Sequence, residues 1–394
     1  MWASIISEWL SLIFRWLHVI AAIAWIGSSF YFIALDLSLK PRAGLPNGVM
    51  GEAWQVHGGG FYHIVKYLVA PAQMPSELTW FKWEAYTTWL SGFVLMIVVY
   101  YLNADLFLVD KSILDLTPVQ AGLFSFGSLA LAWLLYEAAC RSGLAKHELP
   151  FAIGGYIFLV ALTYAFTHVL SGRGAFNQIG AIIGTIMVAN VFAVIIPNQK
   201  KIVAALLAGE APDPKLGKAG KEHSVHNNYL TLPVVVLMIS NHYPLLFGTR
   251  YNWAIVAIVL ALGPVIRHFF NERHKGHPSP WWVWGVAAAG MIAILLLSAA
   301  GPRDAKAAAV APPSFAEVAD IVTSRCSMCH ATEPVWEGIV AAPKGVRLDT
   351  AENIQRNARL IARNAAWSSA MPPGNITEIT GEERAVLAAW AGAQ

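Results

Sequence analysis

Charged residues are scarce in this sequence. Asp, Glu, Lys and Arg make up 13% of the 394 residues, whereas a soluble globular domain carries about 25%. Hydrophobic residues make up 56%, and the mean hydropathy is +0.51. This deficit of charge excludes an ordinary soluble fold for most of the chain and indicates that lipid is its solvent. The 16 Trp residues agree with this, because Trp favours membrane interfaces.

Other features are absent or nearly so. The net charge of +3 is small, which gives no indication of a nucleic-acid partner. With only three cysteines, two of them in one tight motif, no disulfide framework is indicated. Residues 1–14 contain no Lys or Arg, so the basic segment of a cleaved signal peptide is missing. We therefore expect the first apolar span to remain as an anchor.

Long apolar runs recur through the first 300 residues. A helix needs about 20 mostly apolar residues to cross a bilayer, and helices are the default because lipid cannot satisfy open backbone groups. The sequence therefore predicts a bundle of eight spans, with ends uncertain by a few residues. They run at about 10–36, 84–103, 118–140, 149–170, 177–197, 227–248, 252–271 and 281–300.

The connections between these spans differ in their basic residues. One side carries many Lys and Arg, whereas the other carries only Lys111, Arg173 and Arg250. Basic connections stay in the cytoplasm, so both termini are predicted to lie outside. We expect a multi-pass protein of the bacterial inner membrane, with the lipid bilayer as partner and both termini in the periplasm.

The motif C-x-x-C-H at residues 326–330 indicates covalently bound haem. The thiols of Cys326 and Cys329 can reach the two vinyl groups of one porphyrin, and His330 can ligate the iron. A zinc site would need two further ligands nearby, and no Cys or His follows residue 330. The sixth ligand is predicted to be Met371, which two prolines follow in a rigid loop, with Lys344 as the alternative.

The composition changes after residue 300, which suggests separate domains. The sequence predicts an all-α protein with a transmembrane catalytic domain over 1–300, an Ala/Pro linker over 301–313 and a small helical class I-like cytochrome c domain over 314–394. Helices are expected near 315–326, 351–366 and 381–392, with capping boxes at Ser314 and Thr380. Met/His ligation raises the haem potential, so we expect this domain to accept electrons and pass them on.

A cytochrome c usually only carries electrons, so the chemistry is expected in the membrane domain. Intramembrane ionisable groups are the first candidates. Near the outer side lie Arg15, His18, His168 and His242. Three histidines at similar depth can hold a metal or a b-type haem, or bind substrate. The alternative is that each histidine only hydrogen-bonds a neighbouring helix.

A second group of ionisable residues lies near the inner side. Interfacial solvation is the simpler interpretation for them, because many lie at span ends, where charges cost little. This group consists of Asp36, Glu84, Glu137, His223, His226, Arg267 and His268.

The first connection between spans has an unusual composition. It contains three consecutive glycines between His57 and His63, followed by Lys66, and it ends at Trp83 and Glu84. Glycines let backbone N–H groups approach a ligand, and the aromatic, basic and acidic side chains can stack on and hydrogen-bond a flat polar ring. The alternative is an amphipathic segment that lies on the inner membrane surface with Trp anchors.

The order of these parts resembles a known family. A first span with Arg15-Trp16-Leu17-His18, a first loop with His57-Gly58-Gly59-Gly60-Phe61-Tyr62-His63 and Trp80-Phe81-Lys82-Trp83-Glu84, and a terminal C-x-x-C-H resemble the membrane-bound, cytochrome-c-linked urate oxidases. The resemblance covers the whole chain, and the loop motifs are its specific part. It implies oxidation of urate to 5-hydroxyisourate, with electrons leaving through the cytochrome to a downstream cytochrome c or a terminal oxidase and not directly to O₂.

The resemblance and the demands of a urate site together give candidate residues, of which His18, His57, His63, Trp83 and Glu84 are carried over from the matched motifs. The catalytic candidates are His18, His57, His63 and Glu84, and the substrate-binding candidates are Lys66, Trp83, Arg15, His168 and His242. The segment around His18 looks like the first helix of small membrane proteins that bind b-type haem through a helix histidine, so a b-type haem on His18 is a further hypothesis.

The location of the site and the class of reaction leave alternatives open. A site on the inner side lies about 30 Å from the outer face, too far for electrons without a relay, which favours an outer site or an extra intramembrane haem. The chain can also be read as a quinol-oxidising respiratory electron-transfer subunit with a fused cytochrome c. A third interpretation is a haem or metal transporter with a redox-sensing tail.

Overall fold

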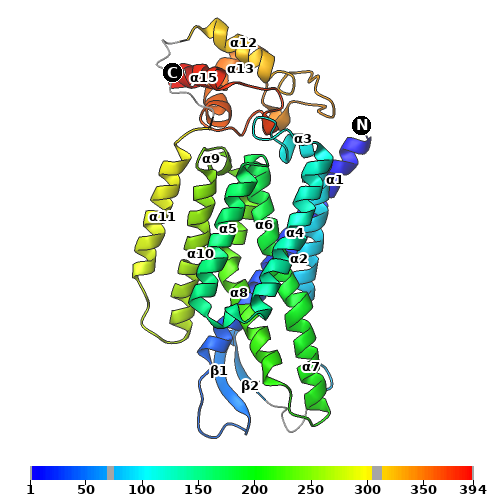
Figure 1. Cartoon of the computed structure of the whole chain (residues 1–394), viewed down its shortest axis with the longest axis vertical. Helices are drawn as coiled ribbons and strands as arrows, with labels where there is room; N and C mark the ends of the chain where they lie inside the picture. The colour runs from blue at the N-terminus through cyan, green and yellow to red at the C-terminus, as the bar shows by residue number, and fades with distance from the viewer. Residues whose placement is uncertain (1, 69–74, 304–312, 393–394) are drawn as a thin grey trace.

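The computed structural model describes residues 2–68, 75–303 and 313–392. It is mostly helical and elongated (Figure 1). Long helices form a bundle, a β-hairpin projects at one end of the bundle, and a smaller helical unit sits on the other end. We call these the hairpin end and the docking end.

The bundle contains a long helix for each predicted apolar run. These are α1 (Trp2–Ser38), α2 (Trp83–Leu95) with its π-helical continuation η1 (Met96–Tyr101), α4 (Pro118–Arg141), α5 (Glu148–Thr167), α6 (Gly172–Ala189) with η3 (Asn190–Ile195) and α7 (Ile196–Leu207), α8 (Pro214–Ile239), α10 (Asn252–His274) and α11 (Trp282–Ser298). Short elements join them, namely α3 (Ala104–Phe107), η2 (Leu144–Lys146), η4 (Ser240–His242) and α9 (Pro244–Phe247).

Within the described residues, five helices are long and apolar enough to cross a membrane. They are Ile5–Ser38, Pro118–Arg141, Glu148–Phe166, Gly172–Leu207 and Asn252–His274, and Trp282–Ser298 is a shorter apolar helix. The several long apolar helices are compatible with a membrane protein, and the number of eight spans stays a prediction.

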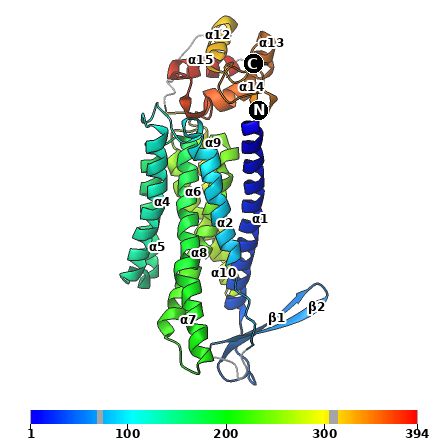
Figure 2. The same cartoon turned by 90° about the vertical axis from the view of Figure 1, so that its right-hand side faces the viewer.

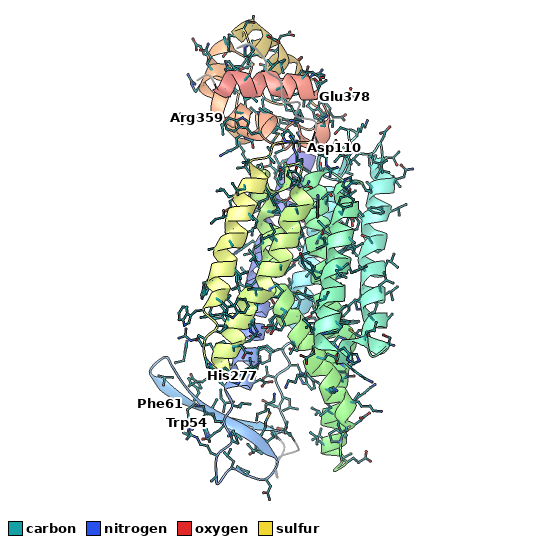
Figure 3. The ribbon with its side chains drawn as sticks, turned by 60° about the vertical axis from the view of Figure 1, so that its left-hand side comes forward. Trp54, Phe61, Asp110, His277, Arg359 and Glu378 are labelled. Atoms are coloured by element: carbon teal, nitrogen blue, oxygen red, sulfur yellow. The ribbon has the colours of Figure 1, made fainter. Side chains whose placement is uncertain are left out.

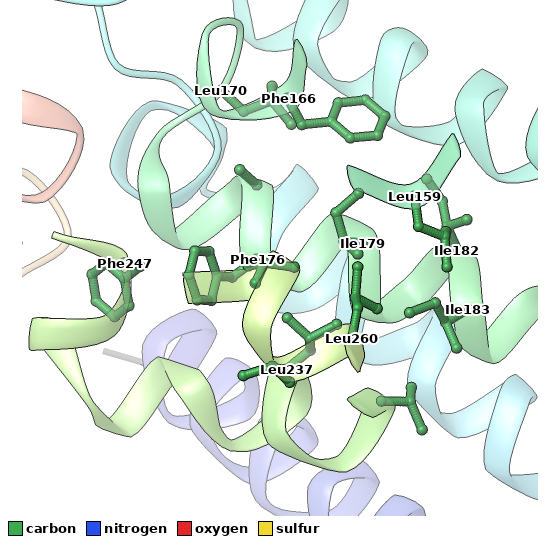
Figure 4. Close-up of a cluster of buried hydrophobic side chains, with 14 of the residues drawn as sticks. Leu159, Phe166, Leu170, Phe176, Ile179, Ile182, Ile183, Leu237, Phe247 and Leu260 are labelled. Atoms are coloured by element: carbon green, nitrogen blue, oxygen red, sulfur yellow. The ribbon is translucent and has the colours of Figure 1, made fainter. Parts of the chain in front are cut away.

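The core of the bundle is centred on α6. Phe176, Ile179 and Ile183 of α6 are buried against Leu237 of α8 and Leu260 of α10 (Figure 4). The start of α6 is fixed by Ser171, whose side chain accepts the N–H of Gly174, and such a cap satisfies a backbone group that the helix leaves open. Helix α6 is therefore the central helix of the bundle core.

The first connection is a β-hairpin and not a helix or an irregular loop. Strand β1 (Val49–His57) pairs with β2 (Gly60–Tyr67) in antiparallel register, with Trp54 opposite His63. Gly58 and Gly59 both have positive φ, as a two-residue hairpin turn requires. The all-α prediction is therefore wrong at this segment, because glycines that we considered for ligand binding form the turn. The hairpin projects sideways from the bundle (Figure 2).

The C-terminal unit has its own core. It contains α12 (Phe315–Arg325), η5 (Pro343–Gly345), α13 (Ala351–Arg356), α14 (Ala358–Ile361), η6 (Ala362–Ala366), η7 (Pro373–Asn375) and α15 (Gly381–Gly392). Val318 and Val322 of α12 pack with Leu387 and Trp390 of α15. The predicted helix starts after Ser314 and Thr380 agree with the structure. The domain boundaries stay predictions, and most of the 301–313 linker lies outside the described residues.

Candidate functional site

The C-x-x-C-H segment follows α12 directly. Nδ1 of His330 lies 2.9 Å from the carbonyl oxygen of Val346. Because a carbonyl can only accept, Nδ1 carries the proton, which leaves Nε2 free to ligate a metal. Cys326 and Met371 are partly buried against the core of the unit, and Cys326 and Cys329 are free thiols. This donor set fits a covalently attached haem with His and Met as axial ligands.

The segment after His330 is held by a carboxylate. Asp349 accepts hydrogen bonds of 2.7 Å from the backbone N–H and the hydroxyl of Thr332. These bonds lower the pKa of Asp349 from 3.8 to about 2. A depressed pKa means that the carboxylate stabilises the fold above its ordinary pKa and that this stabilisation is lost as the pH falls through the folded pKa.

Asp349→Asn is therefore expected to lower the unfolding temperature near neutral pH. The difference from the natural protein should shrink as the pH falls from about 4 towards about 2, where the carboxylate of the natural protein is also protonated. Thermal unfolding followed at several pH values measures this. A difference that stays constant down to about pH 2 contradicts the role given to the carboxylate.

The loop that carries Met371 is anchored inside the C-terminal unit by Arg384. The Arg384 side chain is 2% exposed. Its guanidinium donates to the carbonyl oxygens of Ala365 at 2.6 Å and Met371 at 3.0 Å. A buried guanidinium with several acceptors fixes the backbone on both sides of the loop. Arg384 thus positions the predicted axial ligand.

The same loop rests on the docking end of the bundle. The N–H of Ser369 donates to the carbonyl oxygen of Gly248 at 2.9 Å. A Cβ atom at Gly374 would lie 2.6 Å from the carbonyl oxygens of both Asp105 and Val109. Asp110 marks this boundary between bundle and C-terminal unit (Figure 3). The side of the unit that carries Met371 therefore faces the bundle.

Directly beneath this contact, Arg173 lies between two aromatic rings. Its guanidinium carbon is 5.3 Å from the ring centres of both Phe107 and Phe247, which is a favourable cation–π distance. A cavity of about 20 Å³ separates Arg173 from the docked loop and is lined by Asp110 and Pro373 among others. The cavity has room for about one water molecule.

A buried tyrosine continues this arrangement into the bundle. Tyr100 lies in the π-helical segment η1, and its hydroxyl donates to Oδ1 of Asn241 at 2.8 Å. Its ring is 6.3 Å from that of Phe107, and the positive charges of Arg173 and Arg15 act on its hydroxyl. π-Helical segments often mark functional sites.

We call these residues the docking-end site. It consists of Tyr100, Phe107, Arg173, Asn241 and Phe247. The sequence analysis selected the neighbouring His242 but not Tyr100 or Arg173. The signal in the sequence was that Arg173 is the lone charged residue in the connection between two predicted spans.

The predicted outer residues have separate partners. Nδ1 of His18 donates to the carbonyl oxygen of Thr88 at 2.8 Å, and Nδ1 of His168 donates to Tyr164 of its own helix. His242 lies exposed in η4. Arg15 contacts Ser11 at 3.4 Å. In the described part of the chain, no group of three or more His, Cys, Asp or Glu side chains could hold a metal.

His18 is packed tightly between α1 and α2. A Cβ atom at Gly92 would lie 2.8 Å from Cε1 of His18, so the glycine creates the space that the imidazole occupies. Because Nδ1 carries the proton, Nε2 keeps a lone pair that can ligate a metal. The structure therefore retains His18 as a candidate ligand, while its role stays a prediction.

The catalytic and substrate-binding candidates of the first connection fall into two groups. On the hairpin, His63 bonds Glu52 at 2.6 Å and Lys66 bonds Asp36 at 2.5 Å; His57 ends β1 beside the turn. The other two, Trp83 and Glu84, begin α2. No hydrogen bond, ion pair or ring contact joins the two groups within the described residues. Their catalytic roles stay predictions.

The fold and these sites define a class of protein. It is a mostly helical chain with several helices apolar enough to cross a membrane and with a C-terminal helical unit docked on one end of the bundle.

Comparison with protein families then gives a more specific assignment. The profile of the family described as Urate oxidase N-terminal matches residues 4–298, and the chain belongs to this family. The match covers the bundle and the hairpin and ends before the C-terminal unit. No curated protein matches this chain, and no solved structure matches it. The family indicates a function related to urate and an oxidoreductase.

Proposed function

We propose that the chain is a membrane-bound urate oxidase that converts urate to 5-hydroxyisourate and passes the electrons to its own haem c. The supporting observation is that a bundle of the Urate oxidase N-terminal family carries, on one end, the loop that presents Met371. A downstream cytochrome c or terminal oxidase would take the electrons onward.

The proposed location is the bacterial inner membrane, with the C-terminal unit in the periplasm. Helix α7, which contains Lys200 and Lys201, and strand β2, which contains Lys66, lie at the hairpin end of the bundle (Figure 1). Helix α12, which the C-x-x-C-H motif follows directly, lies at the other end. Basic residues favour the cytoplasmic side. The separation of these two signals along the length of the molecule supports this orientation.

The reaction sets demands on the site. Urate and one water give 5-hydroxyisourate, two protons and two electrons. Urate is a planar anion, so a site needs cationic and hydrogen-bonding groups for its oxygens and a base for its protons. Cys326, Cys329, His330 and Met371 would hold haem c, which would accept one electron at a time. The two electrons from urate would therefore leave in two steps.

We infer that urate binds in the docking-end half of the bundle. Electrons then need not cross the bilayer, and Arg173, Tyr100 and Asn241 supply positive charge and hydrogen bonds there. The cavity beneath the Met371 loop, about 20 Å³, is too small for a purine. The ring would therefore bind in another part of this half of the bundle.

The activity can be tested with purified protein in detergent without oxygen. With an artificial electron acceptor, urate is expected to be consumed and 5-hydroxyisourate to form. Turnover with a quinol and none with urate would favour the quinol-oxidising alternative. Absence of turnover with either donor would favour the transporter interpretation.

The proposed b-type haem on His18 gives a separate prediction. His18→Ala is expected to remove any b-type haem absorption and to leave the haem c spectrum intact, because His18 lies in the bundle and not in the C-terminal unit. His147→Ala is the control, since His147 is an exposed histidine at the start of α5 and is not among the candidate residues. If b-type absorption and urate oxidation both persist in His18→Ala, a relay through His18 is excluded.

A further inference from the structure

Five polar residues gather inside the hairpin half of the bundle. They are Tyr136 and Glu137 of α4, Asn190 of η3, and His223 and His226 of α8. Asn190 is 0% exposed, His223 5% and Glu137 8%. The expectation that these ionisable groups are solvated at an interface is therefore wrong for Glu137 and His223. α8 begins at Pro214, well before His223, and its first turns bury that histidine against α4.

Tyr136 hydrogen-bonds two other members of this cluster. Nδ2 of Asn190 donates to the Tyr136 oxygen at 3.1 Å. The Tyr136 hydroxyl is therefore free to donate its own proton to Nδ1 of His226, 2.7 Å away. The His226 ring stacks on Phe151 of α5 with centres 5.0 Å apart. These contacts fix the positions of the Tyr136 and His226 side chains.

Glu137 and His223 face each other without a hydrogen bond between them in the described part of the chain. Oε2 of Glu137 lies 3.5 Å from Nε2 of His223. Both atoms are buried and have no hydrogen-bond partner within the described residues. His223 uses its other nitrogen to donate to the carbonyl oxygen of Ala219 at 2.8 Å. Two facing acceptors without a proton between them would cost free energy, so the pair favours holding one proton.

The pair also has a connection to the surface. The second carboxylate oxygen of Glu137, Oε1, accepts from Nε of Arg141 at 2.7 Å, and the Arg141 side chain is 78% exposed. Glu137 therefore lies between an exposed cation and a buried imidazole. The titratable or charged groups around the pair are Tyr136, Cys140 and Arg141 on α4 and Glu222 and His226 on α8, while α5 and η3 contribute Phe151 and Asn190.

We propose that Glu137 and His223 form a proton-exchange site that opens to the hairpin end of the bundle. Glu137 holds the proton as a carboxylic acid whose Oε2 faces Nε2 of His223, and Arg141 marks where the proton leaves or enters. Chains of carboxylate, imidazole and hydroxyl groups inside membranes commonly carry protons. The rings of Tyr136 and His226 are the next polar groups, each with its centre 6.1 Å from that of His223.

The site gives the bundle a place to exchange protons at the end opposite the C-terminal unit. The proposed oxidation releases two protons for each pair of electrons, and only this link to the reaction rests on the proposed function. Proton binding by the Glu137–His223 pair itself does not depend on urate, so it can be tested without any substrate.

The test is infrared difference spectroscopy on the full, haem-loaded protein between two pH values, with no substrate present. The natural protein is expected to show a carboxylic C=O band that appears with acid and shifts in D₂O. Glu137→Gln should lose this band. Glu148→Gln is the matched control, because Glu148 is exposed in the first turn of α5, and it should keep the band.

A second variant keeps the test decisive if Glu137→Gln does not fold. His223→Asn retains the carboxyl group and removes the imidazole that faces it, so the band should remain and change its position. The other carboxylates of the chain contribute bands to both proteins. Identical carboxyl bands in the natural protein and in Glu137→Gln overturn the proposal. That result does not bear on urate oxidation, and failure to oxidise urate leaves this band unaffected.

Discussion

Arg384→Met is expected to release Met371 from its position as the predicted iron ligand. The Arg384 guanidinium donates to the carbonyl oxygens of Ala365 and Met371 and is almost fully buried. Methionine fills similar volume but donates no hydrogen bond, so these carbonyl groups would lose a buried partner. Such a loss costs about 1–3 kcal/mol for each unsatisfied group. The free energy of unfolding of the C-terminal unit should fall by about 3 kcal/mol.

The spectroscopic consequence separates positioning from general destabilisation. In the oxidised protein, the weak long-wavelength absorption band of Met-ligated haem c should be lost or strongly reduced in Arg384→Met. The covalent attachment through Cys326 and Cys329 should persist, because it does not depend on the Met371 loop. The midpoint potential should fall, since loss of Met ligation lowers it.

Arg359→Met is the matched control for this variant. Arg359 is an exposed arginine on α14 of the same unit (Figure 3). It should keep both the band and the potential. If Arg384→Met retains the band at full strength after correct folding, Met371 is either not the ligand or not held by Arg384.

Gly374→Ala is expected to separate the C-terminal unit from the docking end. A Cβ atom at this position would lie 2.6 Å from two backbone carbonyl oxygens, those of Asp105 and Val109. Backbone atoms of the bundle cannot yield as a flexible side chain can, so the Met371 loop must move outwards. A misplacement of about 1 Å between reacting groups can cost about 100-fold in rate.

The expected result is a selective loss. Urate-driven reduction of haem c should slow by about 10- to 100-fold, while reduction by a small chemical reductant should remain at the natural rate. Stopped-flow absorption measures both rates on the same preparation. A change in the urate-driven rate alone shows that the contact between the bundle and the C-terminal unit is disturbed. A change in both rates would show that the haem site itself is damaged.

Gly345→Ala provides a control with similar backbone strain. Gly345 has φ +68 and Gly374 has φ +59, and no atom lies within 4 Å of a Cβ at Gly345. Both variants force alanine into the left-handed region, which costs about 1–2 kcal/mol. Only Gly374→Ala also disturbs the contact with the bundle. Equal rates of urate-driven haem c reduction in the two variants would show that electron transfer to haem c does not depend on this contact.

The parts of the fold that depend on local sequence were predictable. Each predicted apolar run lies on a helix, because hydropathy is a property of consecutive residues. The helix starts at Ser314 and Thr380 were also predictable, since a capping box needs only four neighbouring residues. The tautomer of His330 was not, because Val346 follows sixteen positions later.

The hairpin was missed for a specific reason. The pattern around Gly58 and Gly59 is typical both of a ligand-binding loop and of a two-residue turn. The alternation of Trp54 and Val56 with polar neighbours is typical of a strand, which favours the turn at the glycines. The strand pattern covers only part of a long connection, so it was not recognised. Both glycines have positive φ in the structure, which identifies turn formation as their role.

Convergence of distant residues could not be predicted from one sequence. Tyr100 and Asn241 are 141 positions apart, and no local pattern relates them. Glu137 and His223 similarly meet only because α4 and α8 flank the same part of the bundle. A single histidine or glutamate near the end of a span carries no sign of whether it is buried, and interfacial solvation was the simpler expectation.

The measurement that tests the central claim most directly uses the oxidised protein without oxygen. Urate is added, and the absorption spectrum of haem c is recorded over time. We predict that haem c is reduced within seconds by urate and not by other purines or by a quinol. If urate leaves the haem oxidised while a quinol reduces it, the proposal of urate oxidation is contradicted and the quinol-oxidising alternative replaces it.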